Sequence, residues 1–211
     1  MEHVDAYCER LGPGPWAEPL NALSNAAFLV AAAWLWWRYR PGPASLRALP
    51  VLLALVGLGS LSFHTLANTL TNWFDVGFIA VYVVWYLAVF TRHHLGVPWS
   101  RAWWAIPLFL VLAVVTAPLG ALVPGGSGTY LAPFTALVVI TAVAVARRRP
   151  WHDLAAAAGV FAVSVTLRTL DEPLCAAWPT GTHYTWHALN AVVLYLVARQ
   201  VIRSRRAADR P

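Results

Sequence analysis

The stretch 181-GTHYTWHALN-190 places two histidines at the start of an apolar segment that extends to about residue 202. A helix needs about 20 mostly apolar residues to cross a hydrocarbon core, and this segment is long enough. Six further apolar segments precede it, at roughly 21–38, 46–67, 73–91, 102–120, 129–146 and 154–170. The sequence therefore predicts an all-α membrane protein, a bundle of seven transmembrane helices.

The composition agrees with a membrane protein and bounds the domain organisation. Of the 211 residues, 59% are hydrophobic and only 11% are charged. The apolar segments take up nearly the whole chain, so we expect one membrane domain over residues 1–211. Residues 1–20 form an extracytoplasmic N-terminal segment in this interpretation, and residues 203–211 form a basic tail.

The basic residues of the chain are all arginines, and most sit in short clusters between apolar segments. Clusters follow the first, third, fifth and seventh segments: Arg38, Arg40 and Arg47; Arg92 and Arg101; Arg147, Arg148 and Arg149; Arg203, Arg205, Arg206 and Arg210. The positive-inside rule makes that side cytoplasmic, with the N-terminus outside and the C-terminus inside. We expect topology signals here and no nucleic-acid partner. The Arg-only, Ala-rich usage favours a bacterial inner membrane, whose outer side is the periplasm.

Three histidines are expected at the outer ends of two segments. His183 and His187 are four residues apart, so both imidazoles share one helix face. His64 ends the second segment on the same side, and three imidazoles with one open position are typical of catalytic zinc. The alternative is a set of interfacial histidines without metal. Trp186, between two of them, is expected to anchor at the membrane interface.

A serine and an aspartate are predicted beside these histidines. Ser60 lies one turn before His64 on the same face, where its hydroxyl either stabilises an oxyanion or bonds back to its own helix. Asp75 begins the third segment at the same level. It is either a general base and acid or a carboxylate that orients a histidine.

Two residue pairs are predicted to have structural roles at the outer side. Arg168 and Asp171 are spaced i, i+3, which favours an ion pair on one helix face. Cys8 and Cys175 are the two cysteines, and an even number on an oxidising side favours one disulfide. Two free thiols are the alternative.

Taken together, these motifs resemble the alkaline ceramidase family, within the wider CREST superfamily of seven-helix membrane hydrolases and related receptors. The resemblance covers nearly the whole chain. The motifs on which it rests, in chain order, are 7-YCER-10, 18-EPLNALSN-25, 59-GSLSFH-64, Asp75, 168-RTLD-171 and 183-HYTWH-187. Each motif is short and unspecific by itself, and the order and spacing of the set make the resemblance.

The resemblance implies a Zn²⁺ ion held by His64, His183 and His187, with Ser60 and Asp75 in the family's serine and aspartate positions. Such enzymes hydrolyse the amide of ceramide to a fatty acid and a sphingoid base. Zinc and the aspartate activate water, and the serine stabilises the oxyanion. The family's cysteine pair also matches Cys8 and Cys175.

The resemblance further implies a Ca²⁺ ion near the N-terminus. The residues of this chain that match its ligands are Asp5, the carbonyl of Tyr7, Glu9 and Glu18. The chain departs from the family pattern at Ala6 and Leu11, where an Asp and an Asn are usual, and three carboxylates are few for calcium. Asn21 and Ser24 are interpreted as helix-packing residues.

The predicted zinc site, together with what the resemblance implies, predicts a zinc-dependent hydrolase that cleaves ceramide or a ceramide-like N-acyl lipid within the membrane. One alternative keeps the metal and changes the bond, giving a lipid esterase or phospholipase. The other is a zinc-containing seven-helix receptor or sensor, which the short predicted cytoplasmic loops disfavour. The expected partner is a membrane lipid substrate, and no protein partner is implied.

Overall fold

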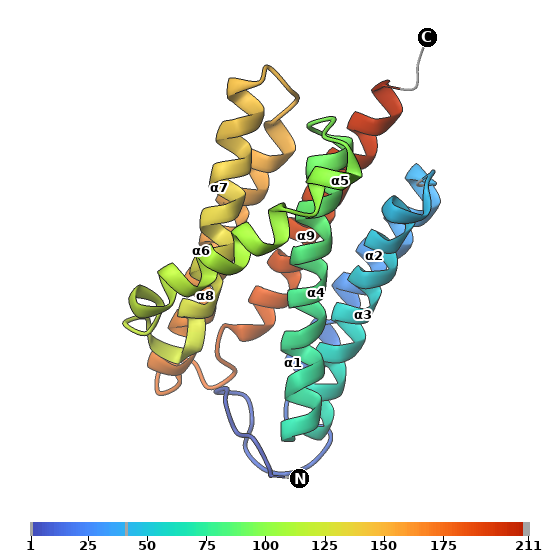
Figure 1. The fold of residues 1–211 in the computed structure, drawn as a ribbon. Helices are drawn as coiled ribbons and strands as arrows, with labels where there is room; N and C mark the ends of the chain where they lie inside the picture. Colours follow the sequence, from blue (N-terminus) through green and yellow to red (C-terminus); the bar gives the residue numbers. More distant parts are fainter. Residues whose placement is uncertain (1, 41, 209–211) are drawn as a thin grey trace.

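The computed structural model describes residues 2–40 and 42–208, and its regular secondary structure is helical (Figure 1). The helices, in chain order, are α1 (Pro19–Ser24), α2 (Ala26–Tyr39), α3 (Ala44–Leu66), α4 (Thr69–His93), α5 (Trp99–Ala102), α6 (Ala105–Gly120), the short 3-10 helix η1 (Pro124–Tyr130), α7 (Leu131–Ala146), α8 (His152–Leu174) and α9 (His183–Ala208). Each of the seven predicted apolar segments coincides with one long helix or with two short ones in sequence. The predicted all-α fold is confirmed.

Six of these stretches are long and apolar enough to cross a membrane, which indicates an integral membrane protein. They are Pro19–Tyr39, Ala44–Leu66, Thr69–His93, Trp99–Gly120, Pro124–Ala146 and His152–Leu174. The seventh helix, α9, does not belong to this group. It carries buried polar residues along its length, including His187, Asn190 and Gln200.

Helix α9 lies inside the bundle, which explains how it accommodates those polar residues. It contacts α8 most extensively and also packs against α1, α2, α3 and α4. Its apolar residues, among them Leu194, Val197 and Val201, belong to the core together with Leu53 of α3 and Tyr82 of α4. A helix surrounded by other helices can bury polar groups against protein instead of lipid.

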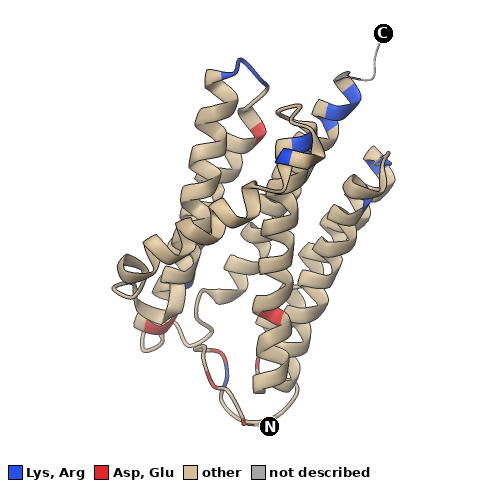
Figure 2. Cartoon of the chain, viewed as in Figure 1, with Lys and Arg blue, Asp and Glu red and all other residues tan. Residues whose placement is uncertain are grey.

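Most of the arginines lie toward one end of the bundle and most of the carboxylates toward the other (Figure 2). We call the end with residues 2–18, the start of α4 and the 175–182 loop the acidic end. The opposite end, with the arginines that flank α2, α3, α5, α7 and α9, is the basic end. The chain begins at the acidic end, and α9 finishes at the basic end (Figure 1). The predicted tail is helical as far as Ala208, and residues 209–211, including Arg210, lie outside the described residues.

The N-terminal segment before α1 folds across the acidic end and is attached to it by hydrogen bonds and a disulfide. The Val4 N–H donates to the Ala67 carbonyl in the α3–α4 turn at 2.8 Å. Cys8 forms a disulfide with Cys175 at the end of α8, as the sequence predicted. This segment therefore covers the end of the bundle at which the predicted histidines lie.

Candidate metal centre

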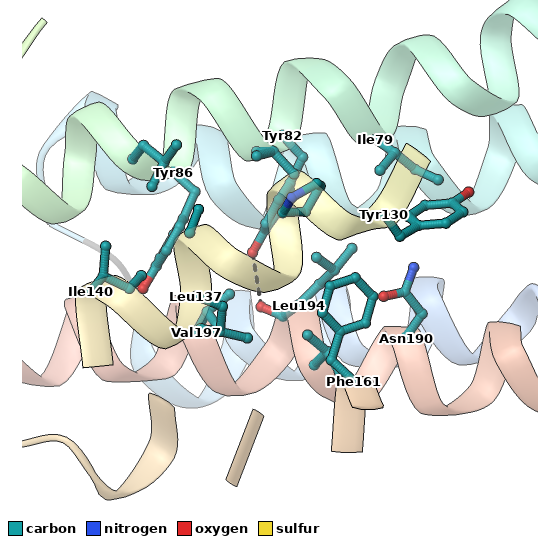
Figure 3. A pocket seen from close by; sticks show the side chains of 15 residues that line it. Ile79, Tyr82, Tyr86, Tyr130, Leu137, Ile140, Phe161, Asn190, Leu194 and Val197 are labelled. Carbon is teal, nitrogen blue, oxygen red and sulfur yellow. Dashed lines mark hydrogen bonds between the residues drawn. The ribbon is translucent and has the colours of Figure 1, made fainter. Parts of the chain in front are cut away.

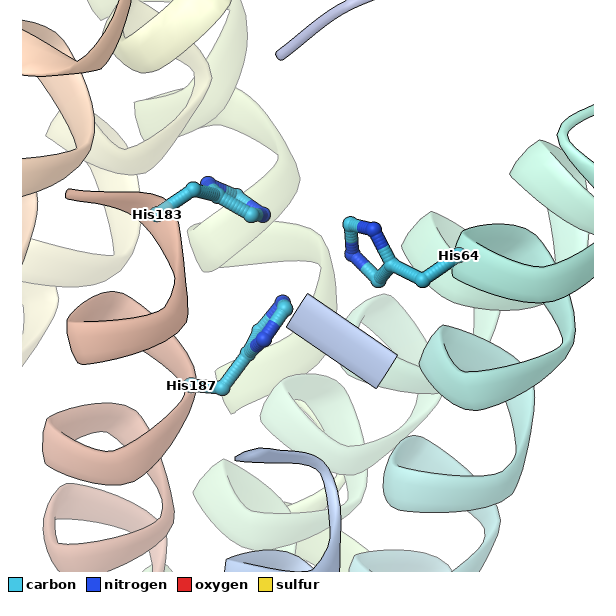
Figure 4. A group of neighbouring side chains, drawn as sticks. All are labelled: His64, His183 and His187. Carbon is cyan, nitrogen blue, oxygen red and sulfur yellow. The ribbon is translucent and has the colours of Figure 1, made fainter. Parts of the chain in front are cut away.

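Three histidines converge at the acidic end of the bundle (Figure 4). His183 and His187 project from the first turns of α9, and His64 projects from the last turn of α3. All three side chains are buried, and one nitrogen from each lies within 4.8 Å of the others. The structure therefore brings together the three residues that the sequence predicted as one metal-binding group.

Two of the histidine rings are oriented by neighbours through Nδ1. His64 Nδ1 lies 2.5 Å from Glu18 Oε2, and a carboxylate can only accept, so Nδ1 carries the proton. His187 Nδ1 lies 2.8 Å from Ser24 Oγ, whose single hydrogen is donated to the Asn21 carbonyl. Ser24 therefore accepts from His187. In the neutral form of each ring that carries its proton on Nδ1, Nε2 offers the lone pair that a metal requires.

The third ring, His183, is positioned through its backbone and by an aromatic stack. Asp171 Oδ1 accepts the N–H groups of Thr182 and His183 at 2.6 and 2.8 Å, which satisfies two donors at the start of α9. Gly181 adopts a φ of 60°, and a Cβ there would collide with the Asp171 carboxylate. The Tyr7 ring stacks on the His183 ring, with centroids 3.6 Å apart and an interplanar angle of 19°.

Ser60 and Asp75 lie beside the histidines. Ser60 is buried, and its Oγ is 3.4 Å from His187 Nε2, so the hydroxyl faces the nitrogen that is free for a metal. Asp75 is half-buried, adjoins Ser60 and interacts electrostatically with His64. The close approach of α3 and α4 permits this neighbourhood, because a Cβ on Gly59 would lie only 2.8 Å from the Phe74 carbonyl oxygen.

The electrostatics of the N-terminal segment favour an ionised Glu18 and a neutral Tyr7. Burial alone would raise the pKa of Glu18, but hydrogen bonds from His64, Asn21 and Arg10 together hold that pKa below its usual value. Burial raises the pKa of Tyr7 well above its usual range, although Arg168 opposes the shift. An anionic carboxylate therefore faces the protonated side of His64.

The residues fit a metal ion on the evidence of their unmet hydrogen-bonding capacity. His64 Nε2 and His183 Nδ1 are buried and have no hydrogen-bond partner among the described residues. Buried polar atoms of this kind are costly unless a partner arrives. The trio is also the one group of three or more His, Cys, Asp or Glu side chains in residues 2–40 and 42–208 that lie close enough to share an ion.

The residues predicted to bind calcium have other partners in the structure. The Glu9 carboxylate accepts the N–H groups of Leu20 and Asn21 at 2.6 and 2.8 Å. Glu18 pairs with Arg10 and His64, and Asp5 is exposed. A calcium ion would have to displace these donors, so the arrangement gives the calcium prediction no support.

Tyr7 is near the centre through its ring and not, as the calcium prediction required, through its carbonyl. That carbonyl accepts the N–H of Arg10 at 3.2 Å. The ring instead covers His183. The segment predicted to hold calcium therefore completes the wall of the histidine centre.

The predicted ion pair between Arg168 and Asp171 is wrong. Asp171 accepts the backbone N–H groups of Cys8, Thr182 and His183. Arg168 donates instead to Gly125, Ser127 and Tyr7. The i, i+3 spacing allowed the pair, but three backbone donors from other segments occupy the carboxylate.

Sequence reasoning also missed residues of the centre. Ser24 was interpreted as a packing residue, yet it holds His187. Its signal was the run of polar residues Asn21, Ser24 and Asn25 on one face of an apolar segment. The prediction that Trp186 anchors at the membrane interface is wrong, because the indole is buried against Tyr130.

Neither a family model nor a curated protein matches this chain.

Proposed function

We propose that this chain is a zinc-dependent intramembrane amide hydrolase that cleaves ceramide or a ceramide-like N-acyl lipid to a fatty acid and an amine. The observation that carries the proposal is the convergence of three buried histidines, of which His64 leaves its Nε2 without a hydrogen-bond partner among the described residues. Three imidazoles with an open fourth position are typical of catalytic zinc, whereas closed structural sites use four protein ligands.

The chain's own residues have distinct roles in this proposal. His64, His183 and His187 would hold the zinc, and the bound ion would act as a Lewis acid and lower the pKa of water. Asp75 accepts a proton from the attacking water and returns it to the leaving amine. The Ser60 hydroxyl, which faces the open side of His187, donates a hydrogen bond to the carbonyl oxygen as negative charge develops.

An apolar cavity supports a lipid substrate (Figure 3). It lies between α4, α7, α8 and α9, has a volume of about 60 Å³ and begins at Asn190, one turn beyond His187. Along α9 it reaches Val197, which is about 10 Å deeper at 1.5 Å per residue. Tyr82 crosses it and donates to the Leu194 carbonyl at 2.8 Å. An acyl chain that widened this cavity on entering would place its amide near the histidines.

A second pocket adjoins this cavity on the side of α6. It lies among α4, α6 and α7, and it shares Ile79, Val83, Tyr130 and Pro133 with the first cavity. Helix α6 covers this side and is the most exposed of the six apolar spans. A lipid that entered the second pocket beside α6 would lie next to the cavity between α4 and α7.

The proposed topology has α9 as a seventh span, the acidic end outside and the basic end in the cytoplasm of a bacterium. The separation of charge between the two ends supports it (Figure 2). A reporter that fluoresces only in the cytoplasm, fused after residue 208, should be bright. A dark reporter in a well-expressed fusion would contradict this orientation.

The activity itself is tested with purified protein and defined lipids. We expect release of fatty acid from an N-acyl sphingoid base, detected by mass spectrometry, and no release by His187→Ala. A panel of glycerolipid esters is the matched comparison. If only ester bonds are cut, the chain is an esterase, and if no lipid is cut, a receptor or sensor becomes the better description.

A further inference from the structure

Arg168 on α8 is a cation with only uncharged hydrogen-bond partners. Its Nη1 donates to the Gly125 carbonyl at 2.6 Å and to Ser127 Oγ at 2.8 Å, and its Nη2 donates to the Tyr7 hydroxyl at 3.3 Å. Its Nε is buried and has no partner among the described residues. The ion pairs within residues 2–40 and 42–208 do not include it. A largely buried charge without a counter-ion is costly.

Three aromatic rings surround this guanidinium and connect it to the site. Its carbon lies 5.9 Å from the Tyr7 centroid, 5.2 Å from Tyr130 and 5.9 Å from Trp186. These rings stabilise the cation in part. Tyr7 also stacks on His183, and Tyr130 lines the apolar cavity. Arg168 therefore contacts one ring that adjoins the histidine centre and another that lines the cavity.

The charges around Arg168 leave room for an anion. Asp75 attracts it without forming an ion pair. The other buried carboxylates nearby are committed: Glu18 to Arg10 and His64, and Asp171 to backbone N–H groups. A divalent metal on the histidines would add positive charge beside the guanidinium. An anionic group on a ligand would be attracted by both.

The position of Arg168 indicates which part of a lipid it meets. Gly125 and Ser127 belong to η1 at the acidic end, while the cavity extends the other way, toward the basic end. An acyl chain in the cavity and an amide at the histidines would leave the headgroup on the side of η1 and Tyr7. The guanidinium is held on that side.

We propose that Arg168 binds a carboxylate in the headgroup of the substrate, so that the site favours an N-acyl amino acid over an uncharged ceramide. This inference rests on the proposed amide hydrolysis. In that reaction the C–N bond breaks, the water's hydroxyl joins the acyl carbon, and its proton joins the amine. The products are a fatty acid and an amino acid.

The test measures binding, so that it does not depend on turnover. Affinities of N-palmitoylglycine, N-palmitoylethanolamine and palmitate are measured by calorimetry on the Ser60→Ala protein, and mass spectrometry checks that each ligand stays intact. The two amides differ in headgroup charge and share the acyl chain. We expect N-palmitoylglycine to bind about tenfold or more tightly than the ethanolamide, as charge-assisted hydrogen bonds do.

Substitutions of the arginine then assign the preference. R168Q should remove it and leave the ethanolamide affinity unchanged, whereas R101Q, at an exposed arginine of the basic end, should keep it. If R168Q does not fold, R168K decides. Lysine keeps the charge and loses the two-pronged donor, so the preference should fall to a few-fold, and an unchanged preference would overturn the proposal.

Other outcomes overturn it as well. Equal affinity for the two amides, or equal weakening of both by R168Q, would make Arg168 purely structural. If R168Q lowered the affinity for palmitate alone, the guanidinium would bind the carboxylate of the released fatty acid and not that of a headgroup. Failure of the unsubstituted protein to hydrolyse any amide would overturn the proposed function, while the binding comparison would still decide the role of Arg168.

Discussion

The two ends of the bundle both bury histidine, but only one end gathers histidines around a shared space. At the acidic end, His64, His183 and His187 face one another. At the basic end, His94 is equally buried, its Nδ1 bonds Ser204 Oγ at 2.7 Å, and its ring stacks on Phe90 with centroids 4.7 Å apart.

The surroundings of the rings explain this difference. At the acidic end, the ionised Glu18 accepts the Nδ1 proton of His64 and leaves Nε2 for a cation. At the basic end, burial and the nearby Arg149 lower the pKa of His94 to about 4. A buried imidazole is therefore not a metal site by itself. What distinguishes the acidic end from His94 is that three rings converge there and that a carboxylate orients one of them.

Removing a converging ligand should have the largest effect. His187→Ala should lose essentially all bound zinc and all hydrolytic activity, because two imidazoles do not hold the ion firmly. The measurement is zinc per protein by elemental analysis, together with fatty-acid release. His94→Ala is the control, since it removes an equally buried ring at the basic end and should keep the zinc. Full activity of His187→Ala without metal would end the zinc mechanism.

Loss of the disulfide should have the next largest effect. Cys8→Ser with Cys175→Ser frees the N-terminal segment, which carries Tyr7 against His183. Closing so long a loop contributes about 2–5 kcal/mol in proteins. We expect a clearly lower Tm in differential scanning calorimetry and faster zinc loss to a chelator. Identical Tm values for the double variant and the parent would show that the segment stays docked without the bond.

The carboxylate behind His64 should have a smaller effect, on metal affinity. Glu18→Gln removes the charge that orients the ring, and such substitutions cost about 10- to 100-fold in affinity. Competition with a fluorescent zinc chelator measures it. Glu172→Gln, an exposed acidic residue near the same end, is the matched control and should leave the affinity unchanged. Equal affinity of Glu18→Gln and the parent would contradict the proposed orienting role.

The smallest effect is expected at the basic end, where acidification should lower the contribution of His94 to stability. His94 stays neutral in the fold because its pKa is about 4, below the usual 6.5. Its contribution to stability is therefore complete above about pH 6.5 and is lost as the pH falls from there toward 4. The groups that face it are Phe90, Ser204 and Arg149.

His94→Leu removes this titration, so its stability should fall less than that of the parent between pH 7 and pH 5. The difference should be about 1–2 kcal/mol, since one pKa unit corresponds to about 1.4 kcal/mol and the position near the helix end is partly screened. Chemical unfolding at the two pH values measures it. Parallel losses in both proteins would show that His94 does not titrate in this range.

Much of the fold could be predicted from the pattern of the sequence. The apolar segments end within a few residues of the helices, because Pro43, Pro98 and Pro124 mark where helices begin. The break at Asn25 within the first segment, which separates α1 from α2, was not predicted. It has no glycine or proline signal.

The candidate site was predicted in part. The spacing of His183 and His187 was sufficient to place two rings on one helix face, and the level of His64 followed from its segment end. The partners of Glu18, Ser24 and Arg168 were not predictable, because they come from segments far apart in the chain. Many donors compete for each carboxylate, and only the packed structure selects among them.

The sequence by itself determined that this is a helical membrane protein with a histidine-rich acidic end, because apolar length and charge clustering are local properties. The tertiary structure alone decided that α9 lies inside the bundle. It also decided that Asp171 binds backbone N–H groups at the start of α9 and does not pair with Arg168. Those outcomes depend on which groups meet across the bundle. Burial makes each unpaired polar group costly, so the packing that satisfies most of them at once determines the partners.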